Sequence, residues 1–206
     1  MILMMAYFTW SVLAFLSGSL PFSVWLGKLF LDVDVRDFGD GNPGATNLFR
    51  AGSPLLGIIT LILDVGKAAL PVGICRFILG LHGPGLVLIA LAPVLGHMFS
   101  PFLHFKGGKA LATALGVWIG LTTWQASLPA VLGVVAGILI FSSPGWAVML
   151  AMGVILLNLL VWIPDPTLLF VWVGQTALLA WSHRLELMKK PHLHQRWYKL
   201  LRKDPG

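Results

Sequence analysis

Residues 145–163 read GWAVMLAMGVILLNLLVWI and contain no charged side chain. About 20 mostly apolar residues in a helix span the hydrocarbon core of a bilayer. The stretch therefore has the length and the composition of a transmembrane helix. Pro164-Asp165-Pro166 ends it, because two prolines around a charge cannot continue a helix.

Similar apolar segments lie on both sides of this stretch, near residues 4–30, 54–80, 84–104, 109–123, 126–141 and 167–183. Apolar residues make up 57% of the 206 positions and charged residues 11%, against roughly 25% charged in soluble domains. A soluble protein of buried helices would need a polar exterior that this sequence does not supply. We therefore predict an all-α integral membrane domain of seven transmembrane helices over residues 1–188, followed by a basic cytoplasmic tail at residues 189–206.

The basic residues predict the orientation of these helices. In a seven-span trace, twelve of the fourteen Lys and Arg residues fall on one side, all except Lys67 and Arg76. Basic residues favour the cytoplasmic side, so we expect the N-terminus outside and the C-terminus in the cytoplasm. With this distribution, the net charge of +6 indicates topology and contact with anionic lipids rather than a nucleic-acid partner.

The polar residues gather on the same predicted side. They occupy residues 31–53, residues 105–109, the turn at residues 141–145, and the chain from His183 onward. A functional site is therefore expected on the cytoplasmic face.

The first polar stretch, residues 34–52, reads DVRDFGDGNPGATNLFRAG. Its glycines permit left-handed backbone conformations, so its N–H groups can converge on an anion. Arg50 follows at a spacing that can bring its guanidinium to the same phosphate. An ordinary polar loop with glycine turns explains the spacing about equally well.

A second polar stretch, Phe105-Lys106-Gly107-Gly108-Lys109, precedes an apolar segment. Two lysines and exposed N–H donors at the start of a helix predict an anion site. The glycine spacing is not that of a Walker loop, and an anchor for lipid headgroups would explain the motif as well. Within segment 54–80, Asp64 and Lys67 can pair on one helix face, which we favour over a catalytic role for these two residues.

Together these stretches resemble the bacterial acyl-phosphate-dependent glycerol-3-phosphate acyltransferases, the PlsY family. The matching blocks, in order, are Gly18-Ser19-Leu20-Pro21, Asp34 with Arg36, Gly39 to Arg50, Leu63 to Ala68, Gly96-His97 and Phe105 to Lys109. The resemblance implies a multi-pass protein of the bacterial inner (plasma) membrane, with seven spans and a cytoplasmic active site. It also implies acyl transfer from acyl-phosphate to the 1-hydroxyl of sn-glycerol 3-phosphate, giving lysophosphatidic acid for phospholipid synthesis.

The expected chemistry needs no metal and no cofactor, because acyl-phosphate is an already activated mixed anhydride. The protein must supply positioning and positive charge for two phosphates. The resemblance assigns substrate binding to Arg50, Asn42, Thr46, Asn47, Lys106, Lys109, Ser143, Gly41 and Gly44. Direct attack by the acceptor hydroxyl is expected, because no Ser-His-Asp arrangement is evident. The partners expected are the two substrates and membrane lipids, without an obligate protein partner.

Two departures mark the chain as a divergent member. Asp40 stands where the family usually has serine, and Glu186 stands where it usually has asparagine, three residues after His183. Both changes place a carboxylate beside a site for phosphates, which should disfavour binding unless Arg or Lys neutralises it. His183 keeps its place in the family pattern and is a candidate catalytic residue. Asp40 and Glu186 are further candidates, because a carboxylate can act as a base. Lys189 is a candidate replacement for a family arginine.

Two alternatives to glycerol-3-phosphate acylation remain open from the sequence. One is an acyltransferase with another acceptor, for which a carboxylate can serve as base or hydroxyl binder. The other is a non-catalytic membrane protein that keeps the same fold.

Overall fold

The computed structural model describes residues 1–194, so residues 195–206 of the expected tail lie outside the described residues. The longer elements are α1 (Ile2–Ser19), α2 (Phe22–Leu31), α4 (Pro54–Gly73), α5 (Gly83–Met98), α6 (Leu111–Thr122), α7 (Ser127–Ile140), α8 (Pro144–Trp162) and α9 (Pro166–Ser182). The shorter elements are α3 (Ala45–Arg50), α10 (Arg184–Leu187), the 3-10 turns η1 (Val35–Asp37) and η3 (Pro101–Leu103), and the π-helical turn η2 (Ile74–Ile78). The described chain is thus helical, as predicted.

Four helical runs of the described chain are long and apolar enough to cross a membrane: Ile2–Leu31, Pro54–Ile78, Gly83–Leu103 and Pro144–Trp162. The apolar helices Leu111–Thr122, Ser127–Ile140 and Pro166–Ser182 are shorter. These runs and helices coincide with the apolar segments predicted from the sequence.

The first apolar segment is not one straight helix. Leu20 adopts an extended conformation, with φ −61° and ψ 118°, between α1 and α2. The following Pro21 explains this break, because proline has no N–H and disfavours helical geometry in the residue before it. The carbonyl oxygen of Leu20, which leaves the helix at this point, accepts a hydrogen bond from Lys67 Nζ at 2.8 Å.

The buried Lys67 joins three elements. Its Nζ lies 2.7 Å from Asp64 Oδ1, which confirms the predicted pairing on α4, and 2.9 Å from His97 Nδ1 on α5. Asp64 and Lys67 are 4% and 5% exposed. Charges at such a depth are stable only when paired, so this network holds α4 and α5 to the break after α1.

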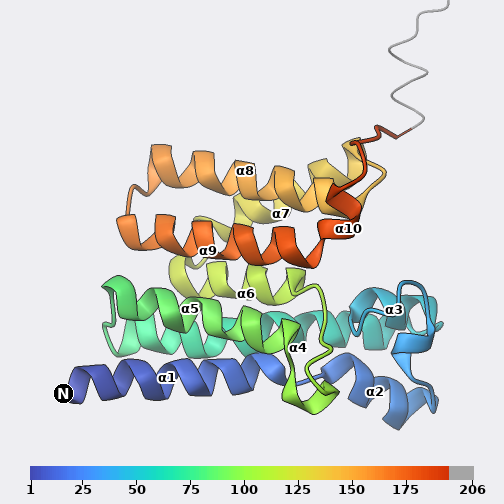
Figure 1. Cartoon of the computed structure of the whole chain (residues 1–206), viewed down its shortest axis with the longest axis horizontal. Helices are drawn as coiled ribbons and strands as arrows, with labels where there is room; N and C mark the ends of the chain where they lie inside the picture. The colour runs from blue at the N-terminus through green and yellow to red at the C-terminus, as the bar shows by residue number, and fades with distance from the viewer. Residues whose placement is uncertain (195–206) are drawn as a thin grey trace, which may run out of the picture.

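The long helices lie side by side, and α2, α3 and α10 gather at one end of the bundle (Figure 1). Small residues allow close packing. A Cβ at Gly116 of α6 would overlap the carbonyl of Val65 in α4, and one at Gly133 of α7 would come within 2.7 Å of Ala151 Cα in α8. Such contacts are typical of helix packing in membranes, where backbones approach at small residues.

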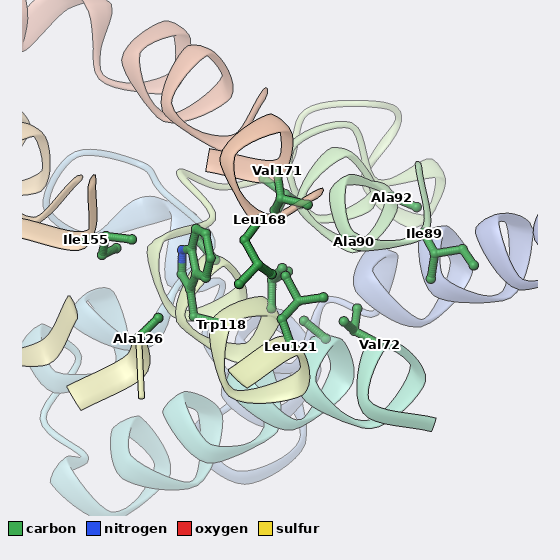
Figure 2. Close-up of a cluster of buried hydrophobic side chains, with 14 of the residues drawn as sticks. Val72, Ile89, Ala90, Ala92, Trp118, Leu121, Ala126, Ile155, Leu168 and Val171 are labelled. Atoms are coloured by element: carbon green, nitrogen blue, oxygen red, sulfur yellow. The ribbon is translucent and has the colours of Figure 1, made fainter. Parts of the chain in front are cut away.

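The interior of the bundle is apolar. Figure 2 shows Trp118 and Leu121 of α6 near Leu168 and Val171 of α9, and each of these side chains is at most 2% exposed. Large apolar side chains also cover the outside; Phe170, for example, is 67% exposed. An apolar exterior around an apolar core is the pattern of a helix bundle that meets lipid.

Candidate active site

The polar residues at the end of the bundle meet at Lys109, just before α6. Lys109 Nζ lies 2.8 Å from Asp40 Oδ2 and 2.5 Å from Glu186 Oε1. These carboxylates are 69 and 77 residues away from Lys109 along the chain. The fold thus brings three of the polar stretches identified in the sequence to one ammonium group. This group neutralises part of the negative charge of Asp40 and Glu186, the two departures from the family pattern.

The loop before α3 is held by hydrogen bonds from Asn47. Its Nδ2 donates to the carbonyl oxygen of Asn42 at 2.9 Å and to Asp40 Oδ1 at 3.3 Å, and its Oδ1 accepts from Arg50 Nη1 at 3.3 Å. Gly39 has φ +58°, and a Cβ there would overlap the Arg50 guanidinium. Glycine is therefore required at position 39, both for the left-handed backbone and to leave room for the Arg50 side chain.

The segment Lys106–Lys109 is closed onto the end of α5. The N–H groups of Gly107 and Gly108 donate to the carbonyl oxygens of Met98 and His97, each at 3.0 Å. The Lys109 N–H donates to Asn42 Oδ1 at 3.0 Å. The expectation of exposed N–H donors in this motif is therefore wrong, because these groups complete the fold, and the lysine side chains alone remain for an anion.

His183 follows α9 and is 3% exposed. Its Nδ1 lies 3.0 Å from Glu186 Oε2, and its Nε2 is buried without a hydrogen-bond partner. The preceding Ser182 donates its hydroxyl to the carbonyl oxygen of Lys109 at 3.1 Å, which ties the end of α9 to the segment before α6. The imidazole is thus held through Nδ1, whereas Nε2 has no hydrogen-bond partner in the described part of the chain.

The ion pairs shift the pKa values of their members. Partial burial acts to raise the pKa of Asp40 and of Glu186, but the contacts with Lys109 outweigh it, so both carboxyl pKa values lie below their ordinary range. Burial likewise acts to lower the pKa of Lys109, and the two carboxylates raise it above its ordinary value. All three groups are therefore charged at neutral pH.

An apolar cavity of about 470 Å³ begins at this cluster and runs between the helices. Its polar end is lined by Asp40, Asn42, Gly44, Thr46, Arg50, Lys109 and His183. Its apolar part is lined by α6, α7, α8 and α9, including Leu115, Trp118, Val131, Val134, Val148, Met152, Ile155 and Leu179. The cavity therefore suits a molecule with an anionic head and a long apolar chain.

A second cavity, of about 410 Å³, shares Asp40, Asn42 and Lys109 with the first as lining residues. It is also lined by Gly41, Lys106, Trp181 and Arg184. Among the described residues, Arg50, Lys106 and Arg184 belong to no ion pair. Three cations thus remain around the two cavities for anionic ligands.

Most of the predicted site residues meet at these cavities. Asn47 lies beneath the loop, where it is 1% exposed and acts through Asp40, Asn42 and Arg50. Ser143 occupies the N-cap position of α8 without a capping hydrogen bond from its side chain, and it lines neither cavity. Lys189 also lines neither; its carbonyl oxygen accepts from Trp146 Nε1.

Two participants were absent from the predicted set. Trp181 and Arg184 line the second cavity, and the Arg184 guanidinium lies 4.6 Å from the centre of the Trp181 ring. Their proximity to His183 in the sequence was the feature from which they could have been predicted. No periodicity distinguishes them from residues that face lipid headgroups.

Comparison with known proteins identifies the family and the fold. Residues 8–190 match the family described as glycerol-3-phosphate acyltransferase. A glycerol-3-phosphate acyltransferase of Pseudomonas paraeruginosa is 39% identical over 180 residues, which cover 86% of this chain and 92% of that protein. One from Anaeromyxobacter sp. is 47% identical over 135 residues, which cover 64% of this chain and 66%, just under two thirds, of that protein's length.

Two solved structures share the fold of this chain. The glycerol 3-phosphate form of PlsY (YgiH), an integral membrane glycerol 3-phosphate acyltransferase, matches with a TM-score of 0.81 and 31% identity. Its lysophosphatidic acid form matches with the same TM-score and 30% identity; in both cases 96% of this chain and 100% of the other are covered. This chain is an integral membrane protein and belongs to the PlsY family of glycerol-3-phosphate acyltransferases.

Proposed function

We propose that this protein transfers a fatty acyl group from acyl-phosphate to the 1-hydroxyl of sn-glycerol 3-phosphate, giving lysophosphatidic acid. The observation that carries the proposal is that an apolar cavity and a polar, cation-lined cavity share Lys109 as a lining residue. One cavity suits an acyl chain and the other a small phosphorylated alcohol. The two ligands would meet at their shared wall.

The donor lies in the apolar cavity. Its chain follows the side chains of α6, α7 and α8, and its phosphate lies at the polar end, within reach of Arg50 and Lys109. Arg50 takes this position because Asn47 Oδ1 accepts a hydrogen bond from its guanidinium and because Gly39 has no side chain to displace it. A guanidinium presents paired donors to phosphate oxygens, and an ammonium adds a point charge.

The acceptor enters through the polar cavity. Its phosphate lies among Lys106, Arg184 and Lys109, and its hydroxyl end points past Asn42 toward the donor. The hydroxyl oxygen attacks the acyl carbon, the bond from that carbon to the phosphate oxygen breaks, and phosphate leaves. Catalysis then depends on positioning and on cations that stabilise the developing charge.

The position of the basic residues at one end of the bundle also indicates the membrane topology. We assign seven spans to the apolar helices, with the N-terminus outside and the cation-rich end in the cytoplasm, where basic residues concentrate. Figure 1 supports this assignment, because the loops on either side of α5, α6, α8 and α9 alternate between the two ends of the bundle. Cytoplasmic access suits both substrates, which places the active site on the inner face of the bacterial plasma membrane.

The direct test uses purified protein in detergent with palmitoyl-phosphate and glycerol 3-phosphate. Release of inorganic phosphate together with lysophosphatidic acid is the expected result. If palmitoyl-phosphate is consumed only when another alcohol or amine is present, that molecule is the acceptor and not glycerol 3-phosphate. Folded protein that consumes no acyl-phosphate with any acceptor would refute the enzymatic proposal altogether.

Val134→Trp should shorten the acyl chain that the apolar cavity accepts. Val134 lines the cavity from α7, and an indole there should displace about two methylene groups of a long chain. Each buried methylene contributes about 0.8 kcal/mol, so KM for palmitoyl-phosphate should rise about tenfold, while KM for octanoyl-phosphate changes little. Leu132→Trp is the matched control, because Leu132 lies on the same helix, is 58% exposed and does not line the cavity. Equal effects of both variants on both donors would contradict this assignment of the cavity.

Asp40→Ser should preserve or modestly raise activity. Asp40 contacts Lys109, but Glu186 also holds that ammonium, so loss of one carboxylate leaves Lys109 anchored. The change removes a negative charge beside the phosphate sites, and KM for glycerol 3-phosphate should stay equal or fall by up to about threefold. Initial rates at varied glycerol 3-phosphate measure the effect. A loss of more than tenfold in kcat would instead assign an active role to the Asp40 carboxylate.

A further inference from the structure

We propose that His183, held by Glu186, accepts the proton of the attacking hydroxyl during acyl transfer. The inference rests on the proposed function and names the base that activates the acceptor. His183 is the catalytic residue of this pair, because it lines the cavity where the reacting atoms meet and its Nε2 has no hydrogen-bond partner in the described part of the chain. Glu186 is a positioning residue, because it acts through the imidazole.

The hydrogen-bond geometry determines which nitrogen is free. An ionised carboxylate can only accept hydrogen bonds, so the contact of 3.0 Å between Glu186 Oε2 and His183 Nδ1 places the imidazole hydrogen on Nδ1. Nε2 then carries the lone pair. This atom is buried and has no partner in the described part of the chain, and His183 lines the apolar cavity at its polar end. A buried acceptor without a partner, on a residue that lines a cavity, is available to a donor that enters the cavity, and a substrate hydroxyl is such a donor.

Burial keeps the imidazole neutral, and the neighbouring carboxylates favour its protonation. Burial lowers the pKa of His183 below its ordinary value, Glu186 of α10 and Asp40 of the loop before α3 act to raise it, and Lys109 acts to lower it. Helix α8 packs against the pair through Gly145 and carries no charged residue. Neutral imidazole therefore predominates at pH 7, and the Glu186 carboxylate stabilises the imidazolium as it forms.

The step balances without a further reactant. The hydroxyl proton moves to His183 Nε2 as the hydroxyl oxygen forms its bond to the acyl carbon. The bond from that carbon to the phosphate oxygen breaks, and its electron pair leaves with the phosphate. The imidazolium then returns the proton to the departing phosphate, which restores neutral His183 for the next cycle.

The test is the pH dependence of kcat/KM for glycerol 3-phosphate in the wild type, His183→Gln and Glu186→Gln. In the wild type the value should rise with pH through an inflection below pH 6.5, because only neutral His183 accepts a proton. His183→Gln should lose this inflection and at least 99% of the plateau rate. Glu186→Gln should lower the plateau kcat about tenfold, with KM within threefold, and move the inflection to lower pH, because the carboxylate that raises the pKa of His183 is gone.

Two matched variants control for unspecific effects. His82→Gln removes an exposed histidine that contacts the Gly80 carbonyl oxygen, and Asp37→Asn removes an exposed carboxylate outside both cavities. Both should retain the wild-type profile. The substrate phosphate itself titrates near pH 6, and the His183→Gln profile isolates that contribution. Histidine ¹⁵N NMR gives a readout apart from activity: the wild type should show unprotonated Nε2 at pH 7, and Glu186→Gln should alter its titration.

The possible results separate this proposal from the one on which it rests. An active wild type whose inflection survives in His183→Gln overturns the role of His183. An active wild type whose profile and His183 titration are unchanged in Glu186→Gln overturns the role of Glu186. A wild type that makes no lysophosphatidic acid at any pH overturns the proposed function and this inference together.

Discussion

Lys109→Met is expected to lower kcat/KM for glycerol 3-phosphate by roughly 1,000-fold. Lys109 lines both cavities and is the cation that pairs with Asp40 and Glu186. Without it, Asp40, which lines both cavities, and Glu186, which lies beside His183, lose the cation that they share. One lost charge interaction at 4 Å costs about 4 kcal/mol at an effective dielectric constant of 20, and each 1.4 kcal/mol corresponds to a factor of ten.

The same measurement distinguishes an electrostatic from a structural effect. The double variant Lys109→Met, Asp40→Ser should recover part of the loss, because it removes one of the uncompensated carboxylates. Lys28→Met is the matched control: Lys28 is exposed, lies 3.6 Å from Asp34 and lines neither cavity, so this variant should keep full activity. A Lys109→Met protein with wild-type kcat/KM would refute the two-cavity arrangement of the substrates.

The helices were predictable because lipid imposes a simple rule. A spanning segment must satisfy its backbone internally and remain apolar, so the apolar run predicted at residues 145–163 corresponds to α8 (Pro144–Trp162). The prolines at 164 and 166 likewise separate α8 from α9. The break at Leu20 was not predicted, because α1 and α2 are equally apolar and Pro21 acts only on the local backbone.

Most residues of the candidate site could be predicted from the sequence, but the contacts between them could not. Charge asymmetry and glycine-rich stretches indicated Arg50, Lys106 and Lys109, since polar residues are costly in an apolar chain. That Lys109 joins Asp40 to Glu186 depends on contacts across 69 and 77 residues, which spacing does not encode. The apolar cavity was also beyond prediction, because the side chains that line it have the same chemistry as those that face lipid.

Gly107→Ala is expected to cause the largest loss of stability of any single methyl addition near the site. A Cβ at this position would overlap the carbonyl oxygen of His97 and come within 2.7 Å of that of Met98. Both obstacles are backbone atoms at the end of α5, so no side-chain rotation relieves the overlap. Overpacking of this kind costs about 1–3 kcal/mol, and the hydrogen bond from the Gly107 N–H to Met98 would be strained as well.

This loss should appear in both stability and activity. The melting temperature in detergent should fall by roughly 5–10 °C, and kcat should fall about 100-fold, since the displaced segment carries Lys109 and a shift of about 1 Å at a catalytic group has this effect. Gly66→Ala is the matched control, because Gly66 lies inside α4 and a Cβ there meets no atom within 4 Å. Alanine in a helix interior is favoured over glycine by about 0.5–1 kcal/mol, so this variant should melt at an equal or higher temperature with full activity. Equal melting temperatures for Gly107→Ala and the wild type would show that the segment before α6 tolerates displacement, and that Lys109 does not depend on the closure against α5.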